Sequence, residues 1–211
     1  MTLHIGEDNI VDIRYSDQKV ARVYKGSDLV WGYAPGEIIF ESDTPGTYNL
    51  YIKCRCKISI VLVGGGGGAA YCLDDFGYHG GKRGGSGSVV TGTISVLAGN
   101  YVVNVSQFGP GKTQRETTVS AADATPSSFG GISAGGGGGA KNVFHDAYND
   151  RGTPGLGGKY NIPSQYSSTL TGTNGVQGST ASTYGSYGGG GAISNNQAQN
   201  GQHGYVKIVA V

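Results

Sequence analysis

The segment Ser106-Gln-Phe-Gly-Pro-Gly111-Lys112-Thr113 is the part of the sequence that most nearly matches a motif with known chemistry. It follows an apolar run and ends in Gly-Lys-Thr, as a phosphate-binding P-loop does. However, Ser106 replaces the first glycine of that motif, and residues 114–119 favour extended structure over the helix whose N-terminus must hold the phosphate. We therefore expect a hairpin loop at 106–113 and no nucleotide binding.

The acidic residues and histidines do not form a recognisable acid–base or metal motif. Asp74 and Asp75 are adjacent, so their carboxylates alternate faces in an extended segment and do not form a pair. His145, Asp146 and Asp150 are close in the sequence but lack the spacing of a metal site or of a nucleophile with its base. We predict that the chain is not an enzyme and that it uses no metal and no cofactor.

The three cysteines do not match a disulfide or zinc pattern. Cys54 and Cys56 lie two residues apart in an apparent strand, so they share a face but are poorly placed to bridge each other. Cys72 adds a third thiol, and no fourth ligand accompanies the set at zinc-site spacing. We expect three reduced, partly buried thiols.

Tyrosine is the residue type that points most clearly to binding. Segments 69–83 and 141–187 place aromatic residues among Gly, Ser, Thr and Asn. Tyrosine offers a large contact area at low side-chain entropy, while the small polar residues adapt their hydrogen bonds. Such loops suit a sugar or a surface protein; alternatively, the tyrosines cover glycine backbone that has no side chains of its own. The candidate receptor-binding residues are Tyr71, Tyr78, Tyr148, Tyr160, Tyr166, Tyr184 and Tyr187.

Charge and hydropathy exclude two kinds of partner. The chain has 15 Lys and Arg against 14 Asp and Glu, so it lacks the basic surplus that phosphate neutralisation requires. Its apolar runs are too short to cross a bilayer. The first eight residues lack the basic and apolar regions of a signal peptide. We expect no nucleic-acid partner, no membrane insertion and synthesis in a cytoplasm.

The elements that must position these residues are strands. Residues 1–35 contain three short segments of partly alternating polarity, which predict a small N-terminal β module. A break at Ala34-Pro35-Gly36 separates it from a second domain, 36–211, in which no convincing amphipathic helix is visible. We predict an all-β protein. The N-terminal strands are expected at 10–15, 19–24 and 28–31, and the later ones at 37–41, 48–52, 57–63, 88–96, 100–105 and 204–211.

Between the later strands lie three glycine runs, 64–68, 135–139 and 188–191, in a chain with 41 Gly among 211 residues. Flexible linkers are one interpretation. Each run, however, adjoins an apolar strand or precedes a specific-looking segment. Pure glycine can adopt a polyproline II-like helix with three residues per turn and a rise of about 3.1 Å. Ordering glycine costs entropy, so such helices need to bundle and to have their ends fixed by strands.

The order of these features resembles a known family. An apolar strand at 58–63 leads into a glycine run, and the pattern continues through 84–94, 98–105, 127–132, another run and a final strand at 204–208. This succession resembles the glycine-rich domain of phage, prophage and bacterial surface proteins, which is similar to that of anaplastic lymphoma kinase receptors. The resemblance implies a jelly-roll-like β-sandwich with an inserted bundle of polyglycine helices. Residues 20–31 separately resemble a short module at the front of phage tail-associated proteins.

The resemblance also implies a setting. It indicates a virion structural protein of a phage tail, tail fibre or baseplate, in which residues 1–35 dock onto other tail proteins and the second domain presents loops to a host receptor or glycan. A homo-oligomer, with a trimer favoured, is expected because fibres and tips of this kind are commonly trimeric. The alternative is a purely structural minor tail or capsid-decorating protein without receptor binding.

Overall fold

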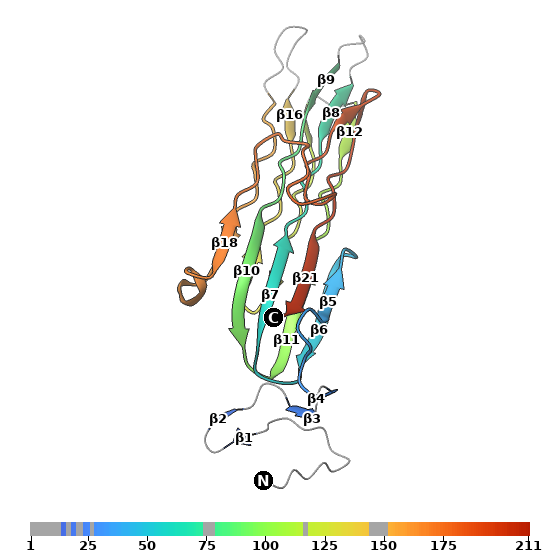
Figure 1. Cartoon of the computed structure of the whole chain (residues 1–211). Helices are drawn as coiled ribbons and strands as arrows, with labels where there is room; N and C mark the ends of the chain where they lie inside the picture. Colours follow the sequence, from blue (N-terminus) through green and yellow to red (C-terminus); the bar gives the residue numbers. More distant parts are fainter. Residues whose placement is uncertain are drawn as a thin grey trace.

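The computed structural model describes residues 14–15, 18–19, 23–25, 28–73, 79–115, 118–143 and 152–211. These residues form an all-β protein, as the sequence predicts, and their single helical element is the short 3-10 turn η1 (Ser164–Tyr166). The molecule is elongated, with two large sheets in one half and short strands at the far end of the other (Figure 1).

Two five-stranded sheets make up the larger half. The first sheet has the order β18-β10-β7-β21-β5 and the second the order β17-β15-β14-β11-β6, and all neighbouring strands in both are antiparallel. The first sheet consists of β5 (Ile38–Ser42), β7 (Cys56–Val63), β10 (Val89–Val96), β18 (Leu170–Thr173) and β21 (Tyr205–Ala210). The second consists of β6 (Gly46–Ile52), β11 (Gly99–Val105), β14 (Ser127–Phe129), β15 (Ile132–Ala134) and β17 (Tyr160–Asn161).

The two sheets pack face to face in a β-sandwich-like arrangement. In β7 the side chains of Ile58, Ile60 and Leu62 are fully buried, while the residues between them are half-buried. This period of two is what a strand with one core face requires. Phe129 and Val103 of the second sheet belong to the same core. Both faces of β7 become buried only at Leu62–Val63, where the chain enters its first glycine run.

Past the sandwich lie the glycine runs, and beyond them a group of short strands (Figure 1). In this group β12 pairs parallel to β8, β8 pairs with β9, and β13 pairs with β16. The short strands are β8 (Ala70–Leu73), β9 (His79–Lys82), β12 (Lys112–Gln114), β13 (Thr118–Ser120), β16 (Lys141–Val143), β19 (Ile193–Ser194) and β20 (Gln197–Ala198). We call the part between sandwich and short strands the glycine section; it comprises 64–69, 84–88, 106–111, 121–125, 135–140, 155–158, 188–191 and 199–203.

Backbone hydrogen bonds in the glycine section repeat every three residues. In segment 64–69 the first and fourth N–H groups donate to segment 85–88, and the third and sixth donate to segment 199–202, at 2.9–3.1 Å. Segment 84–88 behaves alike: its first and fourth N–H groups donate to 188–191 and its second and fifth to 135–138. The runs are therefore ordered by hydrogen bonds to several neighbours, which excludes flexible linkers.

These contacts are so close that the glycine section has no room for side chains. A Cβ atom built on Gly66 would lie 1.8 Å from the carbonyl oxygen of Gly189, and one on Gly67 would lie 2.0 Å from that of Gly138. A hydrogen-bonded backbone cannot move to relieve such a clash, whereas the end of a flexible side chain can rotate away. Glycine is thus required here for close approach.

Much of the N-terminal prediction falls on residues 10–13 and 20–22, which lie outside the described residues. The described residues form two ladders, β1 (Arg14–Tyr15) with β2 (Gln18–Lys19) and β3 (Val23–Lys25) with β4 (Asp28–Trp31), and β4 coincides with the strand expected at 28–31. Trp31 and Tyr33 pack against the sandwich core, although both belong to the predicted N-terminal module, residues 1–35. The domain boundary itself stays a prediction.

The hairpin expected at 106–113 is also wrong. Residues 106–111 run through the glycine section, where Gly109 donates to the carbonyl of Gly66, and Lys112 begins a strand parallel to β8. The apolar strand before this segment and the β-prone residues after it are compatible both with a hairpin and with a segment that runs through the glycine section. The sequence therefore did not distinguish the two. Cys54, Cys56 and Cys72 are buried.

Candidate functional site

The seven tyrosines proposed as receptor contacts do not form one site. Tyr78 and Tyr148 lie outside the described residues. Of the other five, Tyr71 is buried, Tyr166 and Tyr187 are half-buried, and Tyr160 and Tyr184 are exposed. Those that reach the surface are the ones that can meet a ligand.

Tyr71 of β8 covers the protein's own backbone. Its side chain is 4% exposed, and a Cβ on Gly81 would lie 2.7 Å from its ring. Its hydroxyl donates to Oδ1 of Asn196 at 2.9 Å, in the turn between β19 and β20. Burial raises the pKa of this hydroxyl. Tyr71 therefore fits the covering role that the sequence left open. Tyr166 is half-buried: it packs against the sandwich core and also lines a surface hollow with Thr93 and Gln165.

Tyr160 is more accessible. It lies on β17 at the edge of the second sheet and is 39% exposed. A Cβ on Gly172 would lie 2.4 Å from its ring, so one face of the ring rests on that glycine. Tyr160 therefore covers backbone with one face while the rest of its surface meets solvent.

Tyr184 and Tyr187 form an aromatic cluster with a residue that the sequence did not single out, Tyr205 of β21. The ring centroids of Tyr187 and Tyr205 are 4.6 Å apart with an interplanar angle of 5°, and those of Tyr184 and Tyr205 are 6.1 Å apart at 15°. Tyr184 and Tyr187 face each other across a tight turn in which Gly185 has a φ of +56°. Glycine at the first central position is typical of a type II′ turn. The turn thus fixes both rings beside Tyr205.

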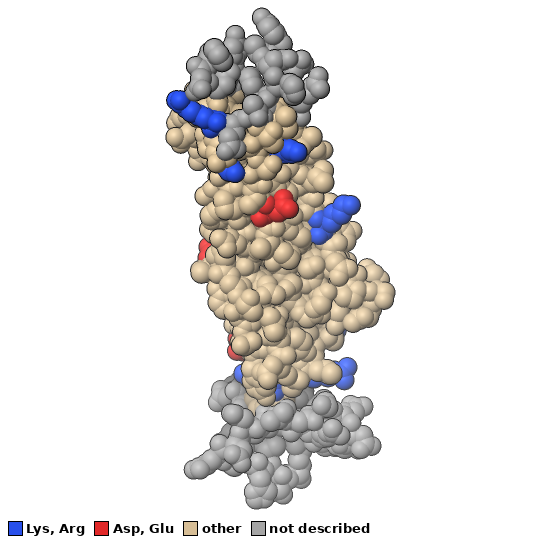
Figure 2. Space-filling view, turned by 180° about the vertical axis from the view of Figure 1, so that it is seen from behind, with Lys and Arg blue, Asp and Glu red and all other residues tan. Residues whose placement is uncertain are grey.

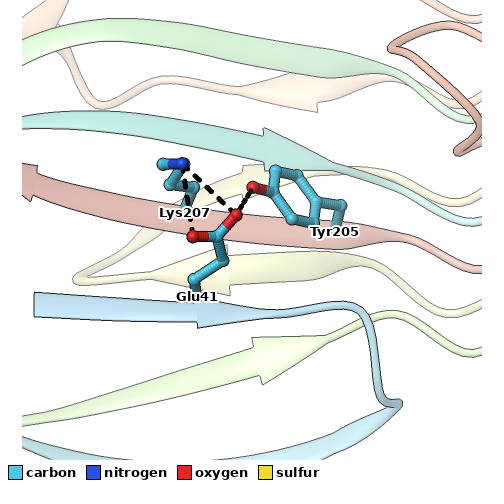
Figure 3. A network of polar contacts seen from close by, with 3 residues as sticks. All are labelled: Glu41, Tyr205 and Lys207. Carbon is cyan, nitrogen blue, oxygen red and sulfur yellow. Dashed lines mark hydrogen bonds and ion pairs between the residues drawn. The ribbon is translucent and has the colours of Figure 1, made fainter. Parts of the chain in front are cut away.

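The carboxylate of Glu41, on the neighbouring strand β5, holds the hydroxyl of Tyr205 in place. Its hydroxyl donates to Oε1 of Glu41 on β5, and Nζ of Lys207 lies 3.2 Å from Oε2 of the same carboxylate (Figure 3). Glu41 and Lys207 are directly opposite in the ladder between β5 and β21. The hydrogen bond from Tyr205, and then Lys207, lower the pKa of Glu41. Burial, followed by the hydrogen bond to Glu41, raises that of Tyr205.

A hollow of about 460 Å³ lies beside this cluster. Its walls are the turn 43–45 between β5 and β6, Ser186 and Tyr187, and Gln202 with His203. The Tyr187 hydroxyl donates to Oδ2 of Asp43 at 3.4 Å, and burial raises its pKa, with the Asp43 charge as the next cause. The hollow therefore places one tyrosine ring, that of Tyr187, beside the carboxylate of Asp43 and the amide of Gln202.

Sequence reasoning placed two of these residues, Tyr184 and Tyr187, among the candidates and missed Tyr205, Glu41 and Asp43. Alternation along the last strand already placed Tyr205 and Lys207 on one face. The missing information was that β21 pairs with β5, because these strands come from opposite ends of the second domain.

Charge on the visible surface is sparse. On the face shown in Figure 2, Lys, Arg, Asp and Glu are scattered and no large area of one sign forms. The described part of the chain contains no helix long and apolar enough to cross a membrane.

The fold defines an all-β protein in which a sandwich-like pair of sheets anchors a section ordered through glycine backbone. The sequence matches the model of the glycine-rich domain over residues 42–209, and the chain belongs to this family. This confirms the glycine-rich domain that the sequence predicts. A comparison with curated proteins finds no match.

Proposed function

We propose that this chain is a structural protein of a phage virion, in a tail, tail fibre or baseplate, that presents a binding surface to the host cell. Residues 1–35 attach to other tail proteins, and the glycine-rich domain carries the surface that contacts a receptor or glycan. The protein functions in the virion after synthesis in the host cytoplasm, without an enzymatic reaction and without nucleic acid.

The observation that carries this proposal is the placement of the ends of the molecule. Strands β3 and β4 lie at the sandwich end, whereas β8, β9 and β16 lie at the far end of the glycine section (Figure 1). Segments 74–78 and 144–151, which include Tyr78 and Tyr148, connect to these far strands. Docking through the sandwich end would leave the far end and the sides of the domain free to contact a host surface.

The finer architecture belongs to the same proposal. The glycine runs are polyglycine helices of the polyproline II type, inserted as a bundle into a jelly-roll-like sandwich. The three-residue period of the hydrogen bonds supports this, because a helix with three residues per turn directs every third N–H group to the same neighbour. Such a bundle is stiff because its backbone groups are hydrogen-bonded between segments, which suits a spacer that holds a surface away from its attachment point.

Cell binding tests the proposal. Purified full-length protein, fluorescently labelled, is expected to bind cells of the bacterium that the parent phage infects and to inhibit phage adsorption in a dose-dependent way. Cells of a resistant strain that no longer adsorbs the phage are the control. Mass measurement in solution tests the expected trimer. Failure to bind susceptible cells and to inhibit adsorption would overturn the receptor role.

The burial of Tyr71 against the protein's own backbone favours the second candidate, a purely structural tail or decorating protein. In that case phage that lack the protein assemble poorly or are less stable, while those that do assemble adsorb at the normal rate. Adsorption measured on purified mutant particles separates the two functions.

A further inference from the structure

We propose that the hollow between the turn 43–45, the Tyr184–Tyr187 turn and Gln202–His203 is a binding site for one neutral sugar unit of a surface polysaccharide. This deepens the proposed attachment function and rests on it, because it names the ligand and the site. The site lies on the sandwich side of the glycine section, away from the strands β8, β9 and β16.

The aromatic wall of the hollow suits a sugar ring. A pyranose has C–H groups on its faces and hydroxyl groups around its edge, so it pairs with a flat aromatic ring flanked by polar groups. Tyrosine offers such a ring together with a polar tip. Tyr187 is fixed for this role by its stack on Tyr205, at 4.6 Å and 5°. Tyr184, 40% exposed, extends the aromatic surface beyond the hollow.

Polar groups at the edge of the hollow are positioned to meet hydroxyl groups. Oε1 of Gln202 accepts from the backbone N–H of Gly189 at 2.9 Å and from the Ser182 hydroxyl at 2.8 Å. These bonds fix the orientation of the amide and leave its NH₂ group to donate to a ligand. Asp43 uses Oδ2 for Tyr187, which leaves Oδ1 to accept from a sugar hydroxyl.

The loop that carries Asp43 is held in place before any ligand binds. The N–H group of Thr44 donates to the Ser42 hydroxyl at 3.1 Å, and the Tyr48 hydroxyl donates to the Thr44 carbonyl at 2.8 Å. A preformed site loses less entropy when its ligand binds. Its volume of about 460 Å³ falls within the range of ligand pockets, roughly 300–1,000 Å³.

Charge selects a neutral ligand. The residues that line the hollow include one carboxylate, Asp43, and neither Lys nor Arg. The nearby Lys207 is paired with Glu41. A uronic acid or a phosphorylated sugar would bring a negative charge next to Asp43, and the lining holds no Lys or Arg to offset it; its one imidazole, His203, packs edge-on against Phe108. Repulsion between like charges disfavours that complex.

The experiment is a titration of the full-length protein by isothermal calorimetry. The probes are methyl glycosides of glucose, galactose, mannose and N-acetylglucosamine, neutral oligosaccharides released from the envelope of the host bacterium, and methyl glucuronide as the charged comparison. We expect saturable binding of at least one neutral probe and at least tenfold weaker binding of the glucuronide.

Variants then locate the site. Tyr187→Ala is expected to weaken binding at least tenfold, and Asp43→Asn to weaken it less, because the amide keeps one acceptor oxygen. Tyr187→Phe keeps the aromatic ring and is expected to retain most of the affinity. It shows whether Tyr187→Ala binds poorly because the ring is missing or because the Tyr184–Tyr187 turn has lost its structure. The control is Tyr51→Ala, which removes another exposed tyrosine, 45% exposed and near the opposite end of β6 from the hollow. Circular dichroism melting shows whether each variant is folded.

Two outcomes overturn the inference: none of the neutral probes binds, or binding occurs and folded Tyr187→Ala and Asp43→Asn bind as the unsubstituted protein does. Failure of the proposed attachment function would give a different result from these two outcomes. Cell binding that persists in both variants and is not inhibited by neutral sugars leaves attachment intact and removes the sugar site. Saturable, Tyr187-dependent sugar binding without any cell binding supports the site and removes attachment.

Discussion

The sandwich and the glycine section are two halves of one domain that become ordered by opposite means. In the sandwich, side chains such as Ile60, Leu62 and Phe129 are fully buried between sheets. In the glycine section, the segments approach until the backbone of one occupies the space where the Cβ of its neighbour would lie, as at Gly66. One half depends on the volume of its side chains and the other on their absence.

This difference explains how they cooperate. Burial of apolar area supplies most of the free energy of folding, and glycine contributes little of it while losing the most backbone entropy. The glycine runs are therefore ordered because the sandwich fixes their ends: the first run continues directly from β7, and the second continues directly from β15. The comparison predicts that opposite changes destabilise the two halves: removal of side-chain atoms in the sandwich and addition of side-chain atoms in the glycine section.

Removal of atoms should do the greatest damage in the sandwich. Phe129→Ala leaves a cavity where the ring stacks on Tyr101, with centroids 5.1 Å apart, and should lower the free energy of unfolding by about 3–5 kcal/mol. Urea denaturation followed by Trp31 fluorescence measures this. The control, Val102→Ala, truncates an exposed residue of β11 and should cost less than about 1 kcal/mol.

Addition of atoms should do the damage in the glycine section. Gly66→Ala places a methyl group 1.8 Å from a backbone oxygen and should cost about 3 kcal/mol, the upper end of the usual range for overpacking. Gly46→Ala is the matched control, since its Cβ would meet only ordinary contacts at 3.5 Å or more, with the Tyr48 ring. Equal stability of the two variants would show that the runs are not closely packed.

The junction between the halves should depend on hydrogen bonds. The buried Ser127 hydroxyl donates to the carbonyl of Val63 at 2.6 Å and accepts from the N–H of Ser106 at 3.0 Å. Ser127→Ala leaves both groups without this partner and should cost about 1–2 kcal/mol. Ser95→Ala, at an exposed position of β10, should change stability by less than about 0.5 kcal/mol. Hydrogen exchange should show faster exchange of glycine amides next to the junction in Ser127→Ala only.

The smallest effect should come from the surface network at Glu41. Its pKa is lower in the folded protein than the ordinary 4.5, so its stabilisation is present above pH 4.5 and is lost as pH falls through the lowered folded value. Glu41→Gln should therefore be slightly less stable than the unsubstituted protein at neutral pH, and the difference should shrink in acid. Tyr205→Phe, which removes the main donor, should weaken this pH dependence. A difference that stays constant between pH 3 and pH 7 would contradict the assignment.

Alternation made six of the ten sandwich strands predictable. The side chains of a strand such as β7 indicate which face is buried, and β5, β6, β10, β11 and β21 were placed to within a few residues for the same reason. The other four, β14, β15, β17 and β18, have two to four residues each, too few to show such a pattern, and were not predicted. The path of 106–111 was not predictable, because it depends on which distant segments supply the hydrogen-bond partners.

The candidate site was only half visible in the sequence. Tyr184 and Tyr187 stood out through composition, whereas Asp43, Gln202 and Tyr205 lie in segments whose composition is ordinary. They meet because β21 inserts between β7 and β5, which brings residues more than 150 positions apart onto one surface.

The sequence by itself determined that this is an all-β chain and that its glycine runs join strands. It could not determine which runs lie side by side, because glycine has no side chain through which a pattern could record a neighbour. Only the tertiary structure determines which runs are neighbours, because the sandwich fixes the ends of the runs. The three-residue period of their N–H and C=O groups then sets which segments can hydrogen-bond to one another. The tyrosine cluster beside Glu41 arose from the same tertiary pairing.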